Sequence, residues 1–441
     1  MSTLRARALQ VQRQEWALSL EQPFMLLTCD GCGHCGAGVG VNQSVAIVEQ
    51  MVSYLTGWGI AARTPHYYES SSHDEYENPQ RAQWRARGGT VYPADDPNIY
   101  YSPYNWHVSP TSAATINAGA YVRFLVSGSF LRLQFDVSHM VTPASEIYWR
   151  VDNGPATLSL VLDTVVVTFP ANNTKATVPF HSIELFVKST TERANRWVAT
   201  AGGKPVPGTR IVLTGLETDG QLAPWLPSDV NLLIYGDSIT EGVMTLGGSQ
   251  HDDTDHNDAS VVYSHALGRL LGAETGVVGF GDNAFTHTGS GGVPILGEAW
   301  DQMWDGVPRN FAAPPPDLIV MNEGTNDGCD TTKPGCVGVD ITAPMAAVLT
   351  SLMGACPGTP IVVLLPFNGG QAAHILAAIR AVGSPDAIHY VNTTGFYDLK
   401  YGGALHPTGP NDVARIAPRI ARRLRPILAK RLLVSRAGVK V

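Results

Sequence analysis

The sequence has few cysteines, few charged residues and no long apolar run. Its 441 residues include six cysteines, and 15% of them are charged. Six cysteines in a chain of this length are too few for a small scaffold that depends on disulfides. The longest apolar runs, such as residues 361–367, are far shorter than the roughly 18–20 residues that span a bilayer. The sequence therefore predicts no membrane span.

An excess of positive charge is also missing. The chain has 30 Lys and Arg against 38 Asp and Glu, a formal net charge of −8. Nucleic-acid affinity depends on clustered basic side chains, so we expect no nucleic-acid partner. Residues 1–24 mix charged and apolar side chains without the uninterrupted apolar core of a secretory signal, so they do not indicate export.

The chain is long enough for two or three packed units, because one domain usually has roughly 100–150 residues. Hydrophobic residues make up 44% of it, so most of the chain is expected to fold. The residue pattern divides it into an N-terminal extension (1–103), a central zone (104–224) and a C-terminal zone (229–436). The extension has no clear repeat, and its pattern predicts no role.

The central zone alternates between apolar and polar side chains. Residues 131–135, Leu-Arg-Leu-Gln-Phe, have the period of two that is typical of a half-buried strand. Residues 183–188 repeat this pattern, and Asp-Asn-Gly-Pro at 152–155 is typical of a turn between two strands. Several short strands with such turns predict an antiparallel, jelly-roll-like sandwich.

The C-terminal zone instead contains continuous apolar runs, as in strands that are buried on both faces. Helical patterns lie between the runs, at residues 264–271 and 345–353 for example. This order predicts β-α-β units on a parallel sheet, where sites form beyond the carboxyl ends of the strands. The runs are residues 232–235, 276–278, 318–321, 361–365 and 388–391.

A serine follows the first of these predicted strands. Ser238 stands in Gly-Asp-Ser-Ile-Thr-Glu-Gly, between the strand at 232–235 and a predicted helix start. This placement presents the hydroxyl at the edge of the sheet, so Ser238 is the candidate nucleophile. A second interpretation is that Ser238 only caps the helix, which is common for serine.

Three further residues follow later strands. Gly281 can offer a backbone N–H to a ligand, Asn326 carries a neutral amide donor, and His406 precedes the last predicted helix. Each has an ordinary interpretation alone: a loop glycine, a turn-forming asparagine, a structural histidine. Together with Ser238 they supply a nucleophile, two oxyanion donors and a base, which is the set that acyl transfer needs.

These four elements, in this order, resemble the SGNH hydrolases, often called GDSL esterases. The resemblance covers roughly residues 229–430 and rests on Gly-Asp-Ser-Ile, Gly281, Gly-Thr-Asn-Asp at 324–327 and His-Pro-Thr at 406–408. It implies a flavodoxin-like α/β domain in which Ser238 attacks an ester and His406 acts as the base. It implies no metal or organic cofactor.

The chain departs from the family at one position. The family usually has an aspartate three residues before the histidine, where this chain has Gly403. The acid of a triad accepts a hydrogen bond from the imidazole, and a backbone carbonyl can also do so. We therefore expect a Ser-His dyad that a carbonyl orients, with Asp398 as the alternative acid.

A narrower resemblance, to the second family of carbohydrate esterases, rests on residues 181–185, 211–216 and 289–294. That family joins a jelly roll to an SGNH domain and removes acetyl groups from plant polysaccharides. The resemblance implies a serine esterase that acts on an acylated carbohydrate, with the exterior of the cell as the place of action. The alternatives are a general aryl or short-chain esterase or lipase of the same fold, and an inactive carbohydrate-binding protein.

Two clusters of potential metal ligands stand outside this set. Cys29, Cys32 and Cys35 have a spacing that zinc sites use, but a fourth ligand is not evident, so a structural loop or a local disulfide is favoured. Residues 251–258 contain two histidines and four aspartates. Such a run can hold a divalent ion, but a solvated loop is the more common outcome.

Overall fold

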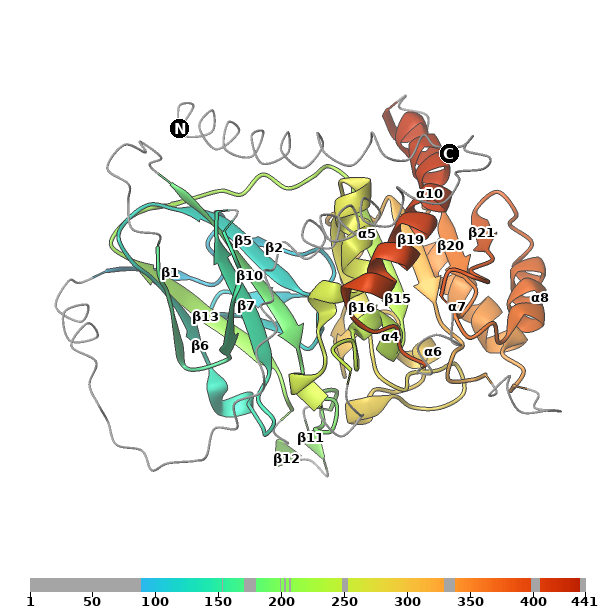
Figure 1. Cartoon of the computed structure of the whole chain (residues 1–441), viewed down its shortest axis with the longest axis horizontal. Helices are drawn as coiled ribbons and strands as arrows, with labels where there is room; N and C mark the ends of the chain where they lie inside the picture. The colour runs from blue at the N-terminus through green and yellow to red at the C-terminus, as the bar shows by residue number, and fades with distance from the viewer. Residues whose placement is uncertain are drawn as a thin grey trace, which may run out of the picture.

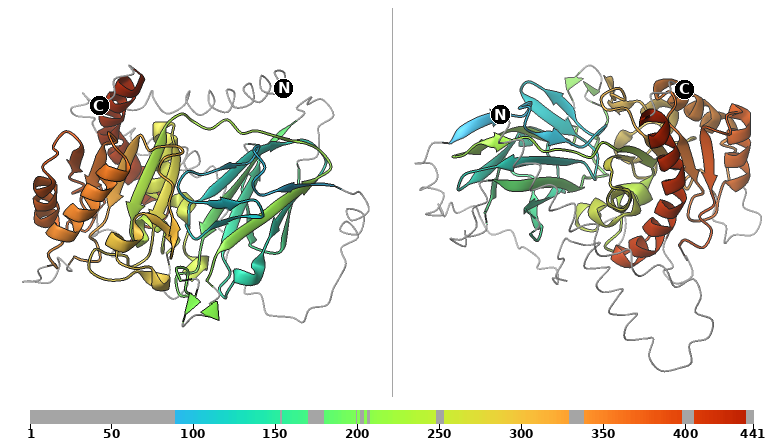
Figure 2. Two further views of the ribbon diagram at one scale, coloured as in Figure 1. Left: turned by 180° about the vertical axis from the view of Figure 1, so that it is seen from behind. Right: turned by 90° about the horizontal axis from the view of Figure 1, so that it is seen from above.

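The computed structural model describes residues 89–436 except 153, 170–179, 199, 202–203, 206–207, 248–252, 329–337 and 398–404. In this part of the chain, a β-sandwich lies beside a parallel sheet that is flanked by helices (Figure 1, Figure 2). Nearly all of the expected N-terminal extension lies outside the described residues. So do five of the cysteines, namely Cys29, Cys32, Cys35, Cys329 and Cys336.

Two antiparallel sheets form the sandwich. One has the order β3-β4-β13-β6-β9, with β1 also on β13, and the other has the order β14-β5-β10-β7-β8, with β2 on β5. The strands are β1 (Thr90–Pro93), β2 (Tyr100–Tyr101), β3 (His107–Ser109), β4 (Ser112–Thr115), β5 (Tyr121–Val126), β6 (Leu131–Phe135), β7 (Glu146–Val151), β8 (Thr157–Leu160), β9 (Thr164–Val167), β10 (His181–Ser189), β13 (Ile211–Thr218) and β14 (Leu222–Ala223).

Strands β1 and β2 precede residue 104, so the expected start of the sandwich is corrected to about residue 90. Its alternating pattern is confirmed in β6, where Leu131, Leu133 and Phe135 are buried and the residues between them are half-buried. Strand β10 differs, because Glu184 and Lys188 are buried as well. The second face of its sheet packs against the C-terminal half, a long-range contact that the local pattern does not report.

The C-terminal half is built on a parallel sheet of five strands in the order β16-β15-β19-β20-β21. All five predicted apolar runs are strands of this sheet. The first four along the chain are buried throughout, whereas His389 and Tyr390 of the last are half-buried. The strands are β15 (Asn231–Gly236), β16 (Glu274–Gly279), β19 (Leu318–Asn322), β20 (Ile361–Leu364) and β21 (Ile388–Val391). Two small hairpins, β11–β12 (Thr200–Ala201 and Lys204–Pro205) and β17–β18 (Gln302–Trp304 and Val307–Pro308), lie outside the main sheets.

Helices cover both faces of the parallel sheet. Side chains of α6, α7 and α8 share one buried apolar cluster with the sheet, and those of α5 and α10 share another. The expected helices at 264–271 and 345–353 are α5 and α7. The helices are α4 (Ser238–Glu241), α5 (Tyr263–Leu271), α6 (Leu296–Ala299), α7 (Thr342–Ala355), α8 (Ala372–Val382) and α10 (Gly409–Arg436).

Buried polar contacts join the sandwich to the parallel-sheet half. Arg123 of β5 forms an ion pair of 2.9 Å with Glu274 of β16, and Asn105 donates to the carbonyl of Val277 at 2.7 Å. Buried polar groups that are paired across an interface fix the relative position of its two sides. The two halves therefore form one continuous packed structure.

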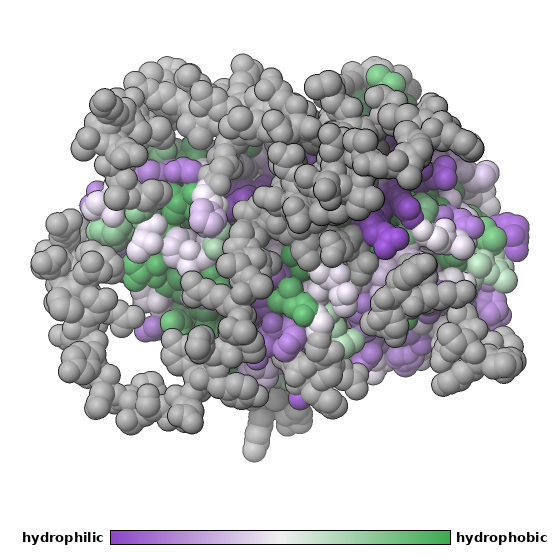
Figure 3. All heavy atoms as spheres, in the orientation of Figure 1, coloured by the Kyte–Doolittle hydropathy of each residue, from purple (hydrophilic) through white to green (hydrophobic). Residues whose placement is uncertain are grey.

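Hydrophilic and hydrophobic residues are interspersed on the visible described surface (Figure 3). None of the described helices is long and apolar enough to cross a membrane.

Candidate active site

The turn after β15 places Ser238 at the carboxyl edge of the parallel sheet. Gly236 ends the strand, and a Cβ there would lie 1.9 Å from Oγ1 of Thr240, so only glycine fits. Asp237 then caps α4, because its carboxylate accepts the N–H of Ile239 at 2.9 Å. The cap of this helix is thus Asp237, and the Ser238 hydroxyl is available for another partner.

His406 is that partner. Its Nε2 lies 2.8 Å from Oγ of Ser238, although the two residues are 168 positions apart. The loop that carries His406 is held by the Tyr397 hydroxyl, which donates to the His406 carbonyl at 3.3 Å. It is also held by the N–H of Gly409, which donates to the carbonyl of Thr245. The structure therefore brings the predicted nucleophile and the predicted base into hydrogen-bond contact.

The surroundings of His406 favour the neutral imidazole. Burial lowers the pKa of His406 below its ordinary value, and the negative charge of Asp282 opposes this shift. A neutral imidazole can accept a proton from a serine hydroxyl, whereas a protonated one cannot. The pair is thus in the protonation state that general-base catalysis requires near neutral pH.

The backbone N–H of Ser238 and the side-chain amide of Asn326 are not fully used by hydrogen bonds within the described part of the chain. Within the described part of the chain, no group accepts from the N–H of Ser238, the first residue of α4. One amide hydrogen of Asn326 is used, since Nδ2 donates to the carbonyl of Asn283 at 2.9 Å. Within the described residues the second amide hydrogen has no acceptor, and the role of Asn326 as an oxyanion donor stays a prediction.

Gly281 differs from the expectation. Its N–H donates to Oε2 of Glu241 at 2.6 Å, so in this structure the group is engaged and does not offer a free oxyanion donor. A Cβ at Gly281 would lie 1.8 Å from Oε1 of Glu192. The glycine is therefore explained here by close packing against carboxylates, which the sequence pattern does not predict.

Asp398, the alternative acid for orienting the histidine, lies outside the described residues. Among the described residues, Asp282 is the acidic group whose charge acts on His406. Asp282 has a left-handed backbone with φ of 54°, and its exposed carboxylate accepts from the Ser290 hydroxyl at 3.3 Å. Asp398 remains a prediction.

This geometry agrees with a comparison against protein families. Residues 234–412 match the model of a family described as GDSL-like Lipase/Acylhydrolase. This segment is a GDSL-like acylhydrolase domain. The expected SGNH resemblance and the expected ester hydrolase are confirmed by this match. No curated relative matches the chain's sequence.

Solved structures share the combination of sandwich and acylhydrolase domain. A family two carbohydrate esterase from Cellvibrio japonicus is 20% identical, with a TM-score of 0.60 over 78% of this chain and 98% of that chain. One from Clostridium thermocellum, in complex with cellohexaose, is 17% identical, with a TM-score of 0.60 over 75% and 99%. An acetyl xylan esterase from Butyrivibrio proteoclasticus is 17% identical, with a TM-score of 0.59 over 77% and 99%. These likenesses show a shared fold.

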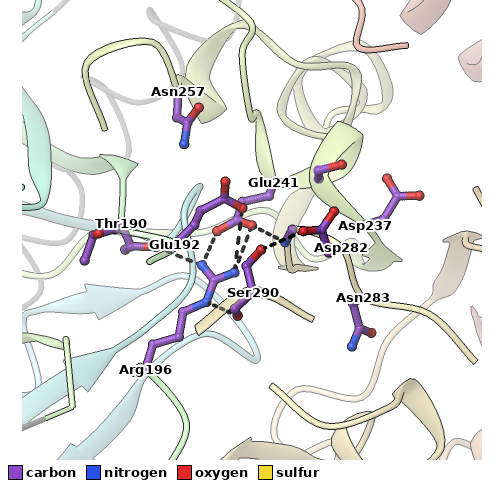
Figure 4. A network of polar contacts seen from close by, with 12 residues as sticks. Thr190, Glu192, Arg196, Asp237, Glu241, Asn257, Asp282, Asn283 and Ser290 are labelled. Atoms are coloured by element: carbon purple, nitrogen blue, oxygen red, sulfur yellow. Dashed lines mark hydrogen bonds and ion pairs between the residues drawn. The ribbon is translucent and has the colours of Figure 1, made fainter. Parts of the chain in front are cut away.

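The sequence does not predict the buried charge network beside the turn that carries Ser238. Arg196 is fully buried, and both of its terminal nitrogens donate to the carboxylate of Glu241 (Figure 4). Glu192 lies alongside, with Oε1 4.0 Å from Nη2 of Arg196. Glu241 is three residues after Ser238, but no pattern near Glu192 or Arg196 indicates that they reach this turn.

The carboxyl of Glu192 holds a proton at neutral pH. Burial and the neighbouring carboxylate of Glu241 raise the pKa of Glu192 to about 9. The network thus contains one cation, one anion and one neutral acid. This balance explains how two carboxyl groups and one guanidinium can be buried together.

We expect Glu192→Gln to become increasingly stabilising as pH rises. The pKa of Glu192 is higher in the folded chain than in the unfolded chain, so the folded chain binds an extra proton and loses stability as pH rises between the two values. Glutamine has no such titration. Between about pH 5.5 and about pH 8.5, the free energy of unfolding of the variant relative to the wild type should therefore increase by up to about 4 kcal/mol. Thermal unfolding at the two pH values would measure this change.

The matched control for this prediction is Glu298→Gln, since Glu298 is exposed on α6. Its stability relative to the wild type should hardly change over the same pH range. A Glu192→Gln difference that is equal at both pH values would show that Glu192 is ionised throughout.

Two aspartates of the acidic run at 251–258 make structural contacts, while residues 251 and 252 lie outside the described residues. Asp253 accepts from the hydroxyl of Thr191 at 2.8 Å, and Asp258 accepts from the hydroxyl of Tyr148 at 2.8 Å. Both contacts join the acylhydrolase domain to the sandwich. Within the described residues, no three His, Cys, Asp or Glu side chains are grouped so that they could hold a metal ion.

Proposed function

We propose that the chain is a serine esterase that removes small acyl groups, above all O-acetyl groups, from a carbohydrate. The observation that carries this proposal is the 2.8 Å contact between Nε2 of His406 and Oγ of Ser238. The solved structures that share its fold include carbohydrate esterases and an acetyl xylan esterase. Their names support an acetylated glycan as the substrate.

In the proposed mechanism, His406 takes the proton of Ser238 as Oγ attacks the ester carbonyl. The N–H of Ser238 and the free amide hydrogen of Asn326 stabilise the oxyanion. The protonated imidazole then donates to the leaving sugar oxygen, which leaves an acyl-enzyme. A water molecule that loses its proton to His406 attacks the acyl-enzyme and releases the acid. A backbone carbonyl or Asp398 orients the imidazole.

We further propose how the chain divides. The sandwich from about residue 90 to 224 corresponds to a jelly-roll-like domain, and residues 229–436 form the acylhydrolase domain. The strand order 2-1-3-4-5 along the second domain is that of flavodoxin-like sheets, which supports this assignment.

Release of acetate is the direct test. Acetylated xylan, acetylated glucomannan and 4-nitrophenyl acetate would be compared as substrates for the wild type. Faster release from a glycan than from the aryl ester supports the proposal. Hydrolysis of the aryl ester alone would favour a general short-chain esterase. No release by folded protein would contradict the proposal and favour a binding protein or another acyl group.

The pH dependence should reflect His406. Because burial lowers its pKa, kcat/KM for 4-nitrophenyl acetate should rise with pH through an apparent pKa below about 6.5 and then stay level near neutral pH. Asp282→Asn removes the charge that raises this pKa, so the variant should have a still lower apparent pKa. An apparent pKa above about 7 in the wild type would contradict the neutral imidazole.

A further inference from the structure

Arg196 belongs to the sandwich part of the chain but ends beside the nucleophile of the other domain. It lies in the segment between β10 and β13, and its side chain is fully buried. Its backbone N–H donates to the carbonyl of Gly291 at 2.9 Å, and Nε donates to the carbonyl of Ser290 at 3.3 Å. The guanidinium is thus fixed against the loop that follows Gly281.

Glu241 connects the guanidinium of Arg196 to the turn that carries Ser238, here called the nucleophile turn. Nη2 of Arg196 lies 3.1 Å from Oε2 of Glu241, and Nη1 contacts Oε1, so the pair is bidentate. The same Oε2 accepts the N–H of Gly281. Glu241 is the last residue of α4, a four-residue helix that begins at Ser238. One carboxylate therefore connects Arg196, the nucleophile turn and the Gly281 loop.

Charge makes this connection depend on Arg196. The carboxyl groups of Glu241, which is buried, and Glu192, which is half-buried, both lie beside the guanidinium (Figure 4). Without the guanidinium, Glu241 would be a buried anion with no counter-charge among the groups of this network, and such a charge is costly. The turn would have to move to admit water or another cation. Ser238, less than one helical turn away, would move with it.

We propose that Arg196 is a positioning residue for Ser238, so that the sandwich completes the active site of the acylhydrolase domain. This inference rests on the proposed esterase function. The sandwich would thus contribute to the reaction through Arg196. Arg196 holds Glu241, and Glu241 holds the turn of Ser238 against the Gly281 loop.

The test compares Arg196→Met with Arg123→Met. Arg123 also joins the sandwich to the other domain, through Glu274. Glu274 begins β16, whose far end at Gly279 is about 16 Å away. Both variants lack an interdomain ion pair, but only the first touches the nucleophile turn. For each variant, kcat, KM, the melting temperature and a crystal structure would be determined.

We expect Arg196→Met to lower kcat by at least about tenfold with little change in KM, because a displaced nucleophile loses reactivity more than binding. Arg123→Met should be less stable but keep kcat within about twofold. Arg196→Lys keeps the charge without the bidentate geometry, so its kcat should lie between those of Arg196→Met and the wild type. In the crystal structures, Oγ of Ser238 should lie beyond hydrogen-bond distance of His406 in Arg196→Met and within it in Arg123→Met.

Equal kcat values and an intact Ser238–His406 hydrogen bond in both methionine variants would overturn the inference. The crystal structures keep this outcome distinct from failure of the proposed function, because they report the position of Ser238 even if the wild type hydrolyses no ester. If Arg196→Met does not fold, the double variant Arg196→Met, Glu241→Gln removes the unpaired anion. Full activity in that folded double variant would likewise overturn the inference.

Discussion

Replacing Ser238 by alanine should lower kcat/KM for 4-nitrophenyl acetate by at least about 10⁴-fold. The alanine side chain cannot form an acyl-enzyme, and only the oxyanion donors and substrate binding remain to assist water. The Ser238 hydroxyl has His406 as its side-chain partner, so its removal should leave the fold intact. Acetate release and the melting temperature would be measured on the same preparation.

Ser351→Ala is the matched control, because Ser351 is exposed on α7. This variant should keep the wild-type rate. A serine-reactive phosphonate should label Ser238 in the wild type and should not label Ser238→Ala at a comparable rate. Substantial activity in Ser238→Ala would mean that the ester is attacked by another group, and the proposed mechanism would be wrong.

The parallel sheet could be predicted because its signal is local. Strands that are covered on both faces need continuous apolar runs, and all five such runs in the C-terminal zone are strands of the sheet. Parallel strands end at one edge, so residues that follow different strands meet there. This is why Ser238 and Asn326, which follow different strands, are predicted to lie at one edge of the sheet.

The buried charged side chains between the two domains, which include the network of Arg196, could not be predicted because their burial depends on long-range packing. Glu184 and Lys188 of β10 occupy positions that the period of two assigns to solvent, but the second face of their sheet is covered. Arg196 is equally polar and fully buried. Nothing in the residues around these positions reports that another domain packs on them.

The surroundings of Gly281 differ from the expectation. The sequence predicts that this glycine lets the backbone approach a ligand and offer its N–H. The structure instead places carboxylates of Glu192 and Glu241 there. The partner of the Gly281 N–H in this structure is thus Glu241 and not the predicted ligand.

Because the N–H of Gly281 is engaged by Glu241, Asn326 is the more important of the two predicted oxyanion donors outside α4, Gly281 and Asn326. Its amide nitrogen donates one hydrogen to the Asn283 carbonyl, and the second hydrogen has no acceptor among the described residues. Asn326→Ala should therefore lower kcat by about 10²–10³-fold, the usual effect of removing one such donor. KM should change little, since the donor acts mainly on the charge that develops in the transition state.

The structural role of Asn326 must be separated from this effect. Removal of the bond to the Asn283 carbonyl would lower the melting temperature, whereas removal of the oxyanion donor would lower kcat. The double variant Asn326→Ala, Ser238→Ala distinguishes the two roles. Once Ser238 is gone, no acyl-enzyme forms, so loss of a donor to its oxyanion should lower kcat only slightly further. A kcat in the single variant within about fivefold of the wild type would instead show that the Ser238 N–H stabilises the oxyanion without help from Asn326.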